Sequence, residues 1–330
     1  MRVDSQPGAP SRAVIGVAIA ALMAIWAINF LVVKVGLRHL PVLTFASFRI
    51  VTAGVFMVLI TPAVARLPMF GVRRNPFRVT GRDLRTFAYL GFFGVAVNQF
   101  CFTAGLRYTN VTHSSIIVGL APIYTLTLAV LFGIEELSWR KASGMSLAFA
   151  GVAILASGAG MNHRSPTLLG DAITMCGSLG FSVYVVLGKR VAGKYDAVTM
   201  SLWNFVFGAL VVLPIAVQQA RAAGFPGFGA MGWQAWLCIA YTGLFSSTLA
   251  YLFYYWLLRY LEASQLAAFS YVLPVSASGL SIVFLGERGT WIELVGALMA
   301  LAGLYWIEAG REARRAESVS LEVGAENRAR

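Results

Sequence analysis

LRYTNVTHSSIIVGLAPIYTLTLAVLFGIEELSW (residues 106–139) and LRYLEASQLAAFSYVLPVSASGLSIVFLGERGTW (residues 258–291) are two versions of one passage, 152 positions apart. The match continues without a gap to residues 151 and 303, with 12 identities in 46 positions. The first-copy members of these pairs are Leu106, Arg107, Tyr108, Pro122, Leu128, Phe132, Glu135, Trp139, Gly144, Ala148, Ala150 and Gly151. Because Trp, Pro, Glu and an Arg-Tyr pair all recur, we interpret the two halves as homologous units.

The composition places these units in a membrane. The 330 residues are 58% hydrophobic and 12% charged, with a mean hydropathy of +0.73. A spanning helix needs about 20 mostly apolar residues, and these runs are continuous rather than alternating, which argues against strands. The sequence predicts an all-α integral membrane protein with ten transmembrane helices near residues 13–33, 42–65, 86–106, 111–133, 142–160, 169–187, 198–218, 235–256, 264–285 and 292–309.

Each half therefore carries five predicted helices. Since five is odd, the second half must enter the membrane from the opposite side, which makes the repeats inverted. We expect a tail at residues 1–12, a first repeat at 13–160, a second repeat at 169–309 and a tail at 310–330. Two inverted halves can pack in two nearly equivalent ways around one site, an arrangement that suits transport by alternating access.

The net charge of +12 indicates orientation rather than nucleic-acid binding. With the N-terminus in the cytoplasm, 19 Lys and Arg fall on the inside and six on the outside. This excess predicts that both termini are cytoplasmic. We expect a multi-pass protein of the cell membrane, of the bacterial inner-membrane type, in contact with lipid. Phosphate recognition by the basic 66–85 link is the alternative interpretation.

Pro122 and Pro274 match across the repeat, and each removes an amide donor from its helix. The carbonyls freed in this way belong to Val118 and Ser270, four residues earlier. We expect both prolines to bend their helices at the middle of the membrane, where freed carbonyls can coordinate a substrate. The alternative is a kink whose backbone groups are satisfied by neighbouring helices.

A stripe of small residues also recurs. Gly144, Ala148 and Gly151 reappear 152 positions later as Gly296, Ala300 and Gly303. Spacings of four and three residues put each set on one helix face, where small side chains let two backbones approach closely. The stripes predict either packing within one chain or the interface of a homodimer.

Several segments resemble the EamA branch of the drug/metabolite transporter superfamily. They are WAINFLVVKVGL (26–37), FASFRIVTAG (45–54), GDAITMCGSLGFSVYVVLGKR (170–190), FVFGALVVLP (205–214) and LAYLFYYWLLRYLEASQLAAFSYVLPVSASGLSIVFLGE (249–287). The resemblance implies a ten-helix carrier whose central cavity is lined by the first, third, fourth, sixth, eighth and ninth helices. It also implies export of amino acids, other metabolites or toxic amphiphiles. The family pattern has one Glu after Gly, so FGIEELSW leaves open whether Glu135 or Glu136 holds that position.

Polar and aromatic residues on the implied lining helices are the candidate substrate contacts. They are able to stack on an apolar group and to hydrogen-bond a polar one. The candidates are Trp26, Asn29, Asn98, Gln99, His113, Tyr184, Tyr251, Tyr255, Gln265 and Tyr271. His113 and Gln265 form a repeat-equivalent pair close to helix starts, so they could lie at the rim of the cavity instead of its centre.

Four charged residues are candidates for coupling or gating. Arg49 lies inside the second helix, where it either holds helices together or contacts substrate or a counter-ion. Asp171 begins the sixth helix and either stabilises its N-terminus or carries a coupling proton. Glu135 and Glu287 end their helices near opposite faces, where we expect contacts that cap a helix or close a gate.

These observations favour a secondary carrier that exports a small metabolite or amphiphile, with a proton gradient as the expected energy source. The sequence has no phosphate-binding loop, no His-Glu-x-x-His and no Gly-x-Ser-x-Gly motif. Its three cysteines have neither disulfide nor metal spacing. We therefore expect no enzyme activity, no cofactor, no metal and no nucleic-acid partner. The alternatives are a lipid flippase, an integral-membrane enzyme or a structural membrane protein.

Overall fold

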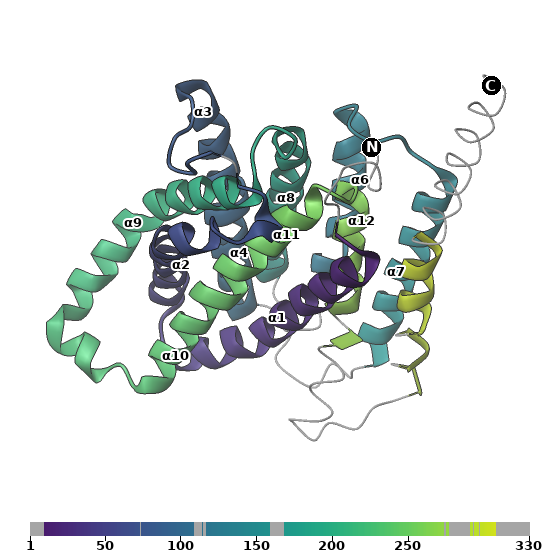
Figure 1. The fold of residues 1–330 in the computed structure, drawn as a ribbon. Coiled ribbons are helices and arrows are strands. Elements are labelled where there is room, and N and C mark those ends of the chain that lie inside the picture. The colour runs from purple at the N-terminus through teal and green to yellow at the C-terminus, as the bar shows by residue number, and fades with distance from the viewer. Residues whose placement is uncertain are drawn as a thin grey trace.

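The computed structural model is helical throughout the part of the chain that it describes, which contains no strand (Figure 1). The described residues are 10–72, 74–108, 114, 117–158, 168–273, 275–276, 291–292, 294–296 and 298–307. Within these ranges the predicted all-α class is confirmed. The expectations for His113, Pro274, Glu287, most of the N-terminal tail and the C-terminal tail lie outside the described residues.

The first half contains eight described helical elements. The long helices α1 and α2 are joined by a two-residue link, and α3, the π-helical segment η2 and α4 form one continuous span. The bounds are α1 Arg12–His39, α2 Val42–Val64, the 3-10 turn η1 Pro68–Phe70, α3 Gly81–Leu90, η2 Gly91–Val97, α4 Asn98–Tyr108, α6 Ala121–Leu131 and α7 Trp139–Gly158.

The second half has a matching order. The helices α10 and α11 are joined by a second π-helical segment, η3, into one span, and α12 tightens into the 3-10 turn η4. The bounds are α8 Leu168–Val191, α9 Ala197–Ala230, α10 Trp233–Tyr241, η3 Thr242–Leu249, α11 Ala250–Leu258, α12 Ala263–Ala268 and η4 Phe269–Tyr271.

Six of the ten predicted spans are long and apolar enough to cross a membrane. They correspond to α1, α2, the α3–η2–α4 span, α8, residues 197–222 of α9, and the α10–η3–α11 span. The predicted spans 111–133 and 292–309 are represented by the shorter apolar helices Ile117–Leu131 and Leu294–Ile307. Of the other two, 142–160 overlaps α7, and 264–285 is described only in part.

The two π-helical segments occupy equivalent places. Residues 91–97 of η2 and residues 243–249 of η3 are 152 positions apart, which is the spacing of the sequence repeat. A π-helical turn inserts an extra residue into the helix and changes which face the following side chains present. The residues just after each segment are therefore turned in the same way in both halves.

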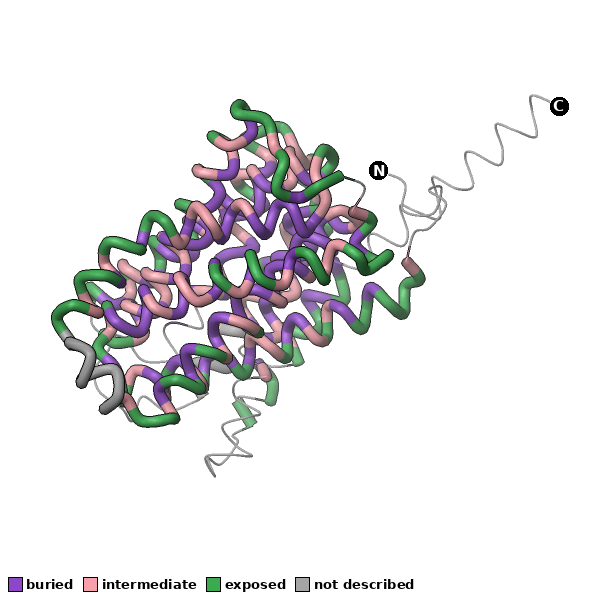
Figure 2. The backbone as a smooth tube through the Cα atoms, turned by 60° about the vertical axis from the view of Figure 1, so that its left-hand side comes forward, coloured by how far each residue is buried: buried purple, intermediate pink, exposed green. Residues whose placement is uncertain are grey.

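Close helix packing holds the bundle together. The helix α2 packs along α9, α4 packs along α8, and α1 lies against α10 and α11. Small residues make this possible: a Cβ on Gly177 would meet the backbone oxygen of Asn98 at 3.1 Å, and one on Gly180 would meet that of Phe93 at 2.9 Å. Figure 2 shows buried residues concentrated inside the bundle and exposed residues on its outside.

The outer surface of the bundle is apolar. Leu59 is 67% exposed, Val17 is 69% exposed and Leu131 is 75% exposed. Large apolar side chains spread over a helical surface fit a bundle surrounded by lipid, because helices satisfy their own backbone groups there.

The small-residue stripes pack on each other within the chain. Figure 1 places α7 beside the yellow segment that contains residues 294–307. A Cβ on Gly151 would come within 2.7 Å of the Gly296 oxygen, and one on Gly144 would come within 3.0 Å of the Gly303 oxygen. Of the two interpretations of the stripes, the structure therefore supports packing within one chain.

Candidate functional site

A cavity of about 100 Å³ lies in the middle of the bundle. All six helices implied by the family resemblance contribute to its wall, and α2 adds Arg49. The lining residues are Trp26, Asn29, Phe30, Arg49, Asn98, Gln99, Phe102, Val118, Ala121, Thr174, Ser178, Phe181, Ser246, Tyr251, Tyr254, Leu266, Ala267, Ser270 and Leu273.

The lining follows the sequence repeat. Twelve of these nineteen residues form six pairs whose members are 152 positions apart. The pairs are Trp26 with Ser178, Asn29 with Phe181, Gln99 with Tyr251, Phe102 with Tyr254, Val118 with Ser270, and Ala121 with Leu273. Equivalent positions of the two halves thus face one common space.

Rings from three helices form one wall of the cavity. The Trp26 ring lies 5.7 Å from Tyr254 and 5.9 Å from Phe181, measured between centroids. A hydrogen bond of 3.2 Å from Trp26 Nε1 to the Ser246 carbonyl fixes the indole against η3. Phe30 and Phe102 form a further edge-to-face pair at 5.1 Å. Such walls suit a flat or apolar group of a ligand.

The polar part of the lining includes Arg49, which is only 2% exposed. Its NH1 donates to the Thr103 hydroxyl at 3.3 Å, and that hydroxyl donates to the Gln99 carbonyl at 2.8 Å. The Gln99 side chain is itself oriented, since Ser247 donates to its Oε1 at 2.9 Å. Thr103 and Gln99 are one helical turn apart, so the guanidinium group lies near the turn that carries Gln99.

Asn98 and Tyr251 line the cavity, but their polar groups are hydrogen-bonded to other groups of the protein. The Tyr251 hydroxyl donates to Asn98 Oδ1 at 3.0 Å, and Asn98 Nδ2 donates to the Gly177 carbonyl at 3.0 Å. These bonds connect α11, α4 and α8. Asn98 and Tyr251 therefore contribute to a ligand site mainly by holding these three helices in position.

Six predicted site residues thus lie on the cavity wall: Trp26, Asn29, Arg49, Asn98, Gln99 and Tyr251. Four others are buried outside the lining: Tyr184, Tyr255, Gln265 and Tyr271. The Tyr255 hydroxyl accepts from Asn204 at 2.8 Å, and the Tyr271 hydroxyl donates to the Met145 carbonyl at 3.3 Å. The Tyr184 ring covers Gly94. These tyrosines fill spaces between helices instead of facing the cavity.

The helices depart from α geometry just before both proline positions. The fourth helix is interrupted by a turn at Leu120, so Pro122 is the second residue of α6. In the ninth helix, η4 precedes position 274. Val118 and Ser270, whose carbonyls the prolines were expected to free, both line the cavity.

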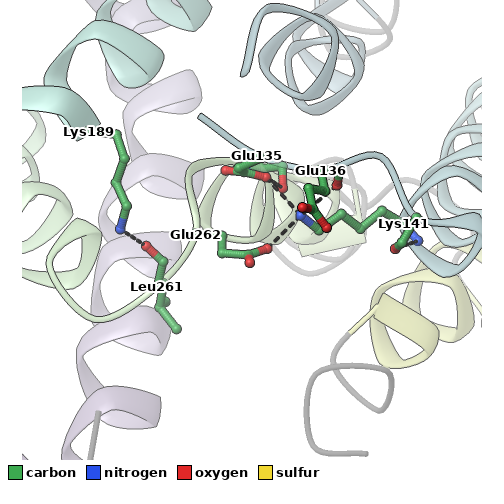
Figure 3. A network of polar contacts seen from close by, with 8 residues as sticks. Glu135, Glu136, Lys141, Lys189, Leu261 and Glu262 are labelled. Atoms are coloured by element: carbon green, nitrogen blue, oxygen red, sulfur yellow. Dashed lines mark hydrogen bonds and ion pairs between the residues drawn. The ribbon is translucent and has the colours of Figure 1, made fainter. Parts of the chain in front are cut away.

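A network of charged residues joins chain links at one end of the bundle (Figure 3). The Glu135 carboxylate accepts from the Ser264 amide at 3.1 Å and from the Ser264 hydroxyl. Lys141 lies 3.0 Å from Glu135 and 2.6 Å from Glu262. The Glu135 side chain is 4% exposed and makes these contacts, whereas Glu136 is exposed.

Further contacts join chain links at this same end. Lys189 donates to the carbonyls of Leu258, at 2.5 Å, and Leu261. Arg190 donates to the Phe132 carbonyl at 2.7 Å. Lys194 lies 2.7 Å from Asp83, and this hydrogen bond raises the pKa of Lys194. The links joined here are those that the charge count places on the cytoplasmic side.

Asp171 lies in the first turn of α8 and is not part of the cavity lining. This position fits the predicted stabilising role at the N-terminus of the sixth helix.

Sequence reasoning missed most of the aromatic and small lining residues. Phe102, Phe181 and Tyr254 are aromatic, Ser178 is small, and none of the four carried a distinguishing signal of its own. The repeat spacing was the available signal, because adding 152 to Trp26 and Asn29 gives Ser178 and Phe181. Arg49 and Gln99, in contrast, were identifiable as polar side chains in apolar helices.

Comparison with known proteins agrees with this architecture. The model of the EamA-like transporter family matches residues 13–157 and 168–309. The probable amino-acid metabolite efflux pump of Salmonella typhimurium is 26% identical over 309 residues, covering 91% of this chain and 96% of that protein. The probable terminal-alkyne amino-acid exporter of Streptantibioticus cattleyicolor is 24% identical over 301 residues, covering 91% and 95% respectively.

A solved crystal structure is similar in fold, with a TM-score of 0.70 at 16% identity, covering 93% of this chain and 100% of that one. At such low identity the likeness concerns the fold alone. The family match, in contrast, extends over both halves and nearly the whole helical region. The chain is therefore a multi-pass membrane protein that belongs to the EamA-like transporter family.

Proposed function

We propose that this protein is a secondary carrier that exports small metabolites by alternating access. One observation carries the proposal: repeat-equivalent residues from both halves line a single central cavity. In a carrier built from two inverted repeats, one site is exposed to either face as one half moves against the other. The two π-helical segments, placed 152 positions apart on the third and eighth helices, support the same symmetry.

The topology proposed with this function has ten membrane helices in two inverted units, residues 13–160 and 169–309. Both termini lie in the cytoplasm of the cell, and the protein is in the cell membrane. The Glu135–Lys141–Glu262 network is then at the cytoplasmic end and acts as the inner gate. The two ion pairs that Lys141 makes with Glu135 and Glu262 support a carrier whose inner gate is closed in this conformation.

The proposed substrates are amino acids, related metabolites or toxic amphiphiles. The names of the relatives from Salmonella typhimurium and Streptantibioticus cattleyicolor refer to amino-acid compounds. The aromatic wall around Trp26 is suited to an apolar group, and the lining near Arg49 and Gln99 to a polar one. Together the two features suit an amphiphile.

Coupling to a proton gradient is part of the proposal, with Asp171 as the candidate proton carrier. A carboxyl group in a membrane helix that borders a polar cavity can exchange a proton as access alternates. Asp171→Asn is expected to abolish pH-driven uptake while leaving exchange of solute for solute. If the pH dependence were unchanged, Asp171 would not be the coupling residue.

A lipid flippase is the second candidate function, and the apolar wall of the cavity favours it. A structural protein and an integral-membrane enzyme have less support, because the relatives with printed functions are named as transporters or exporters. A homodimer remains compatible with the exposed apolar surface.

The test is transport by purified protein in proteoliposomes. Labelled amino acids, their metabolites and cationic amphiphiles are offered with and without an imposed pH gradient. A fluorescent phospholipid reports lipid movement in the same vesicles. Uptake of a soluble compound would support the carrier function. Movement of the lipid alone would refute it in favour of the flippase function.

A further inference from the structure

The cavity wall carries polar atoms that have no partner in the described part of the protein. They are Asn29 Oδ1, Arg49 Nε, Gln99 Nε2, the Tyr254 hydroxyl and the Ser270 hydroxyl. Each of these five side chains is more than nine-tenths buried. Buried polar atoms are almost always hydrogen-bonded, so five unpartnered ones around one space indicate groups that bind something from outside the chain.

Donors predominate among these atoms. Arg49 Nε and Gln99 Nε2 can only donate, and the two hydroxyls can donate as well as accept. Asn29 Oδ1 is the one atom of the five that can only accept. A ligand rich in acceptor oxygens would satisfy more of this wall than a ligand rich in donors.

Arg49 also has no counter-ion among the described residues. The described residues that line the cavity include no Asp or Glu, and none of the ion pairs found in the described part of the chain involves Arg49. The carboxylate of Glu135, in the network of Figure 3, is already bound to Lys141 and Ser264. An unpaired charge at this depth in a membrane is costly, which favours a binding partner of opposite sign.

We infer that this cavity selects an organic anion whose carboxylate binds Arg49 and Gln99 while its apolar body packs against Trp26, Phe181 and Tyr254. Arg49 offers the fixed guanidinium fork that matches a carboxylate. This inference rests on the proposed carrier function and specifies which class of metabolite is preferred. It concerns charge, which neither the family match nor the names of the relatives specify.

A cationic ligand is disfavoured in the same space. Aromatic rings can attract an ammonium group, but Arg49 lies in the same cavity and repels it. An ammonium group would also find one dedicated acceptor, Asn29 Oδ1, among the five unpartnered atoms. A zwitterion keeps the favourable carboxylate contact and adds this unfavourable one, so it should bind between the anion and the cation.

Four compounds with the same phenylalanine side chain test the inference. N-acetylphenylalanine is an anion, phenylalanine a zwitterion, N-acetylphenylalaninamide is neutral, and phenylalaninamide is a cation at neutral pH. Binding is measured by the thermal shift of the full-length protein in detergent at increasing ligand concentration, and transport is measured in proteoliposomes. We expect the anion to bind about 10- to 100-fold more tightly than its neutral amide, the range for a hydrogen bond to a charged group. Equal or tighter binding of the amide or the cation would overturn the inference.

Two substitutions locate the effect. Arg49→Gln is expected to remove the preference for the anion and to leave binding of the neutral amide within about threefold of wild type. Gln99→Glu keeps the acceptor for Ser247 and places a carboxylate beside Arg49. The affinity for the anion should therefore fall about tenfold or more, while the affinity for the neutral amide changes little. If Arg49→Gln does not fold, Gln99→Glu and the wild-type ligand series still decide the question. A retained anion preference in Gln99→Glu would contradict the assignment.

The outcome separates this inference from the proposed function. Transport of several compounds regardless of charge would leave the carrier intact and refute anion selection. Tight binding of the anion with no transport of any compound under any gradient would support the anion site and refute the carrier.

Discussion

The carboxylate of Glu135 accepts hydrogen bonds from both the backbone amide and the side-chain hydroxyl of Ser264, which is 129 positions later in the chain. Glu135 follows the end of α6, and Ser264 is in the first turn of α12. The fourth and ninth helices, which carry the matched prolines, are therefore joined directly at one end of the bundle. Lys141, 3.0 Å from Glu135, adds α7 to this junction.

Glu135→Gln is expected to destabilise the protein more than Glu262→Gln. Both carboxylates contact Lys141, but the Glu135 side chain is 4% exposed and that of Glu262 is 50% exposed. Removal of the buried charge should cost about 1–3 kcal/mol, and removal of the exposed one less than about 1 kcal/mol. Thermal unfolding in one detergent measures both. Equal losses would contradict the larger contribution expected of the buried carboxylate.

Tyr254→Phe and Tyr255→Phe form a matched pair of substitutions. Both rings are buried, but the Tyr254 hydroxyl is unpartnered at the cavity, whereas the Tyr255 hydroxyl accepts from Asn204 at 2.8 Å. Tyr255→Phe should lower the free energy of unfolding by about 1–2 kcal/mol, because it leaves an Asn204 donor unsatisfied. Tyr254→Phe should change stability by less than about 0.5 kcal/mol and alter the relative rates for different substrates.

Stability is again measured by thermal unfolding, and substrate preference by competition in proteoliposomes. A large stability loss in Tyr254→Phe with unaltered preference would show that this hydroxyl belongs to the core.

Gly151→Ala is expected to separate α7 from the last helix. The added methyl group would lie 2.7 Å from the Gly296 carbonyl oxygen, and a backbone atom cannot give way as a side chain can. Overpacking of this kind costs about 1–3 kcal/mol. Gly16→Ala in α1 is the control, because no atom lies within 4 Å of its new methyl group. Unfolding measurements should find the control unchanged or slightly stabilised, and comparable effects of the two would refute the packing.

The family resemblance implied which helices line the cavity, but not which face of each helix does so. Trp26, Asn29 and Gln99 were candidates because they are polar or aromatic residues on those helices, and they do line the cavity. Tyr254 and Tyr255 are adjacent in a helix that is apolar on all sides, so no hydrophobic pattern distinguishes the face toward the cavity. The π-helical segment η3 then rotates the side chains that follow it, which no sequence pattern indicated.

Arg49 illustrates a second limit. The family resemblance gave the second helix no lining role, and the sequence alone left a structural contact and a substrate contact equally open. The structure places Arg49 on the cavity wall because α2 crosses close to α4, where Thr103 holds the guanidinium group. Such a contact depends on the crossing of two helices and is not encoded in the residues of either one alone.

Pro122→Ala is expected to slow transport without destabilising the fold. The proline follows the turn at Leu120, and an alanine would supply an amide that can bond to the Val118 carbonyl and extend α6 backwards. One additional hydrogen bond in the helix, about 0.5–1.5 kcal/mol, would have to be broken each time the helix bends, which reduces the rate up to about tenfold. Pro62→Ala near the end of α2 is the control, because Pro62 does not line the cavity. Both variants are compared by their initial transport rates in proteoliposomes and by their unfolding temperatures. Equal rates for the two would show that the bend at Pro122 has no part in the transport cycle.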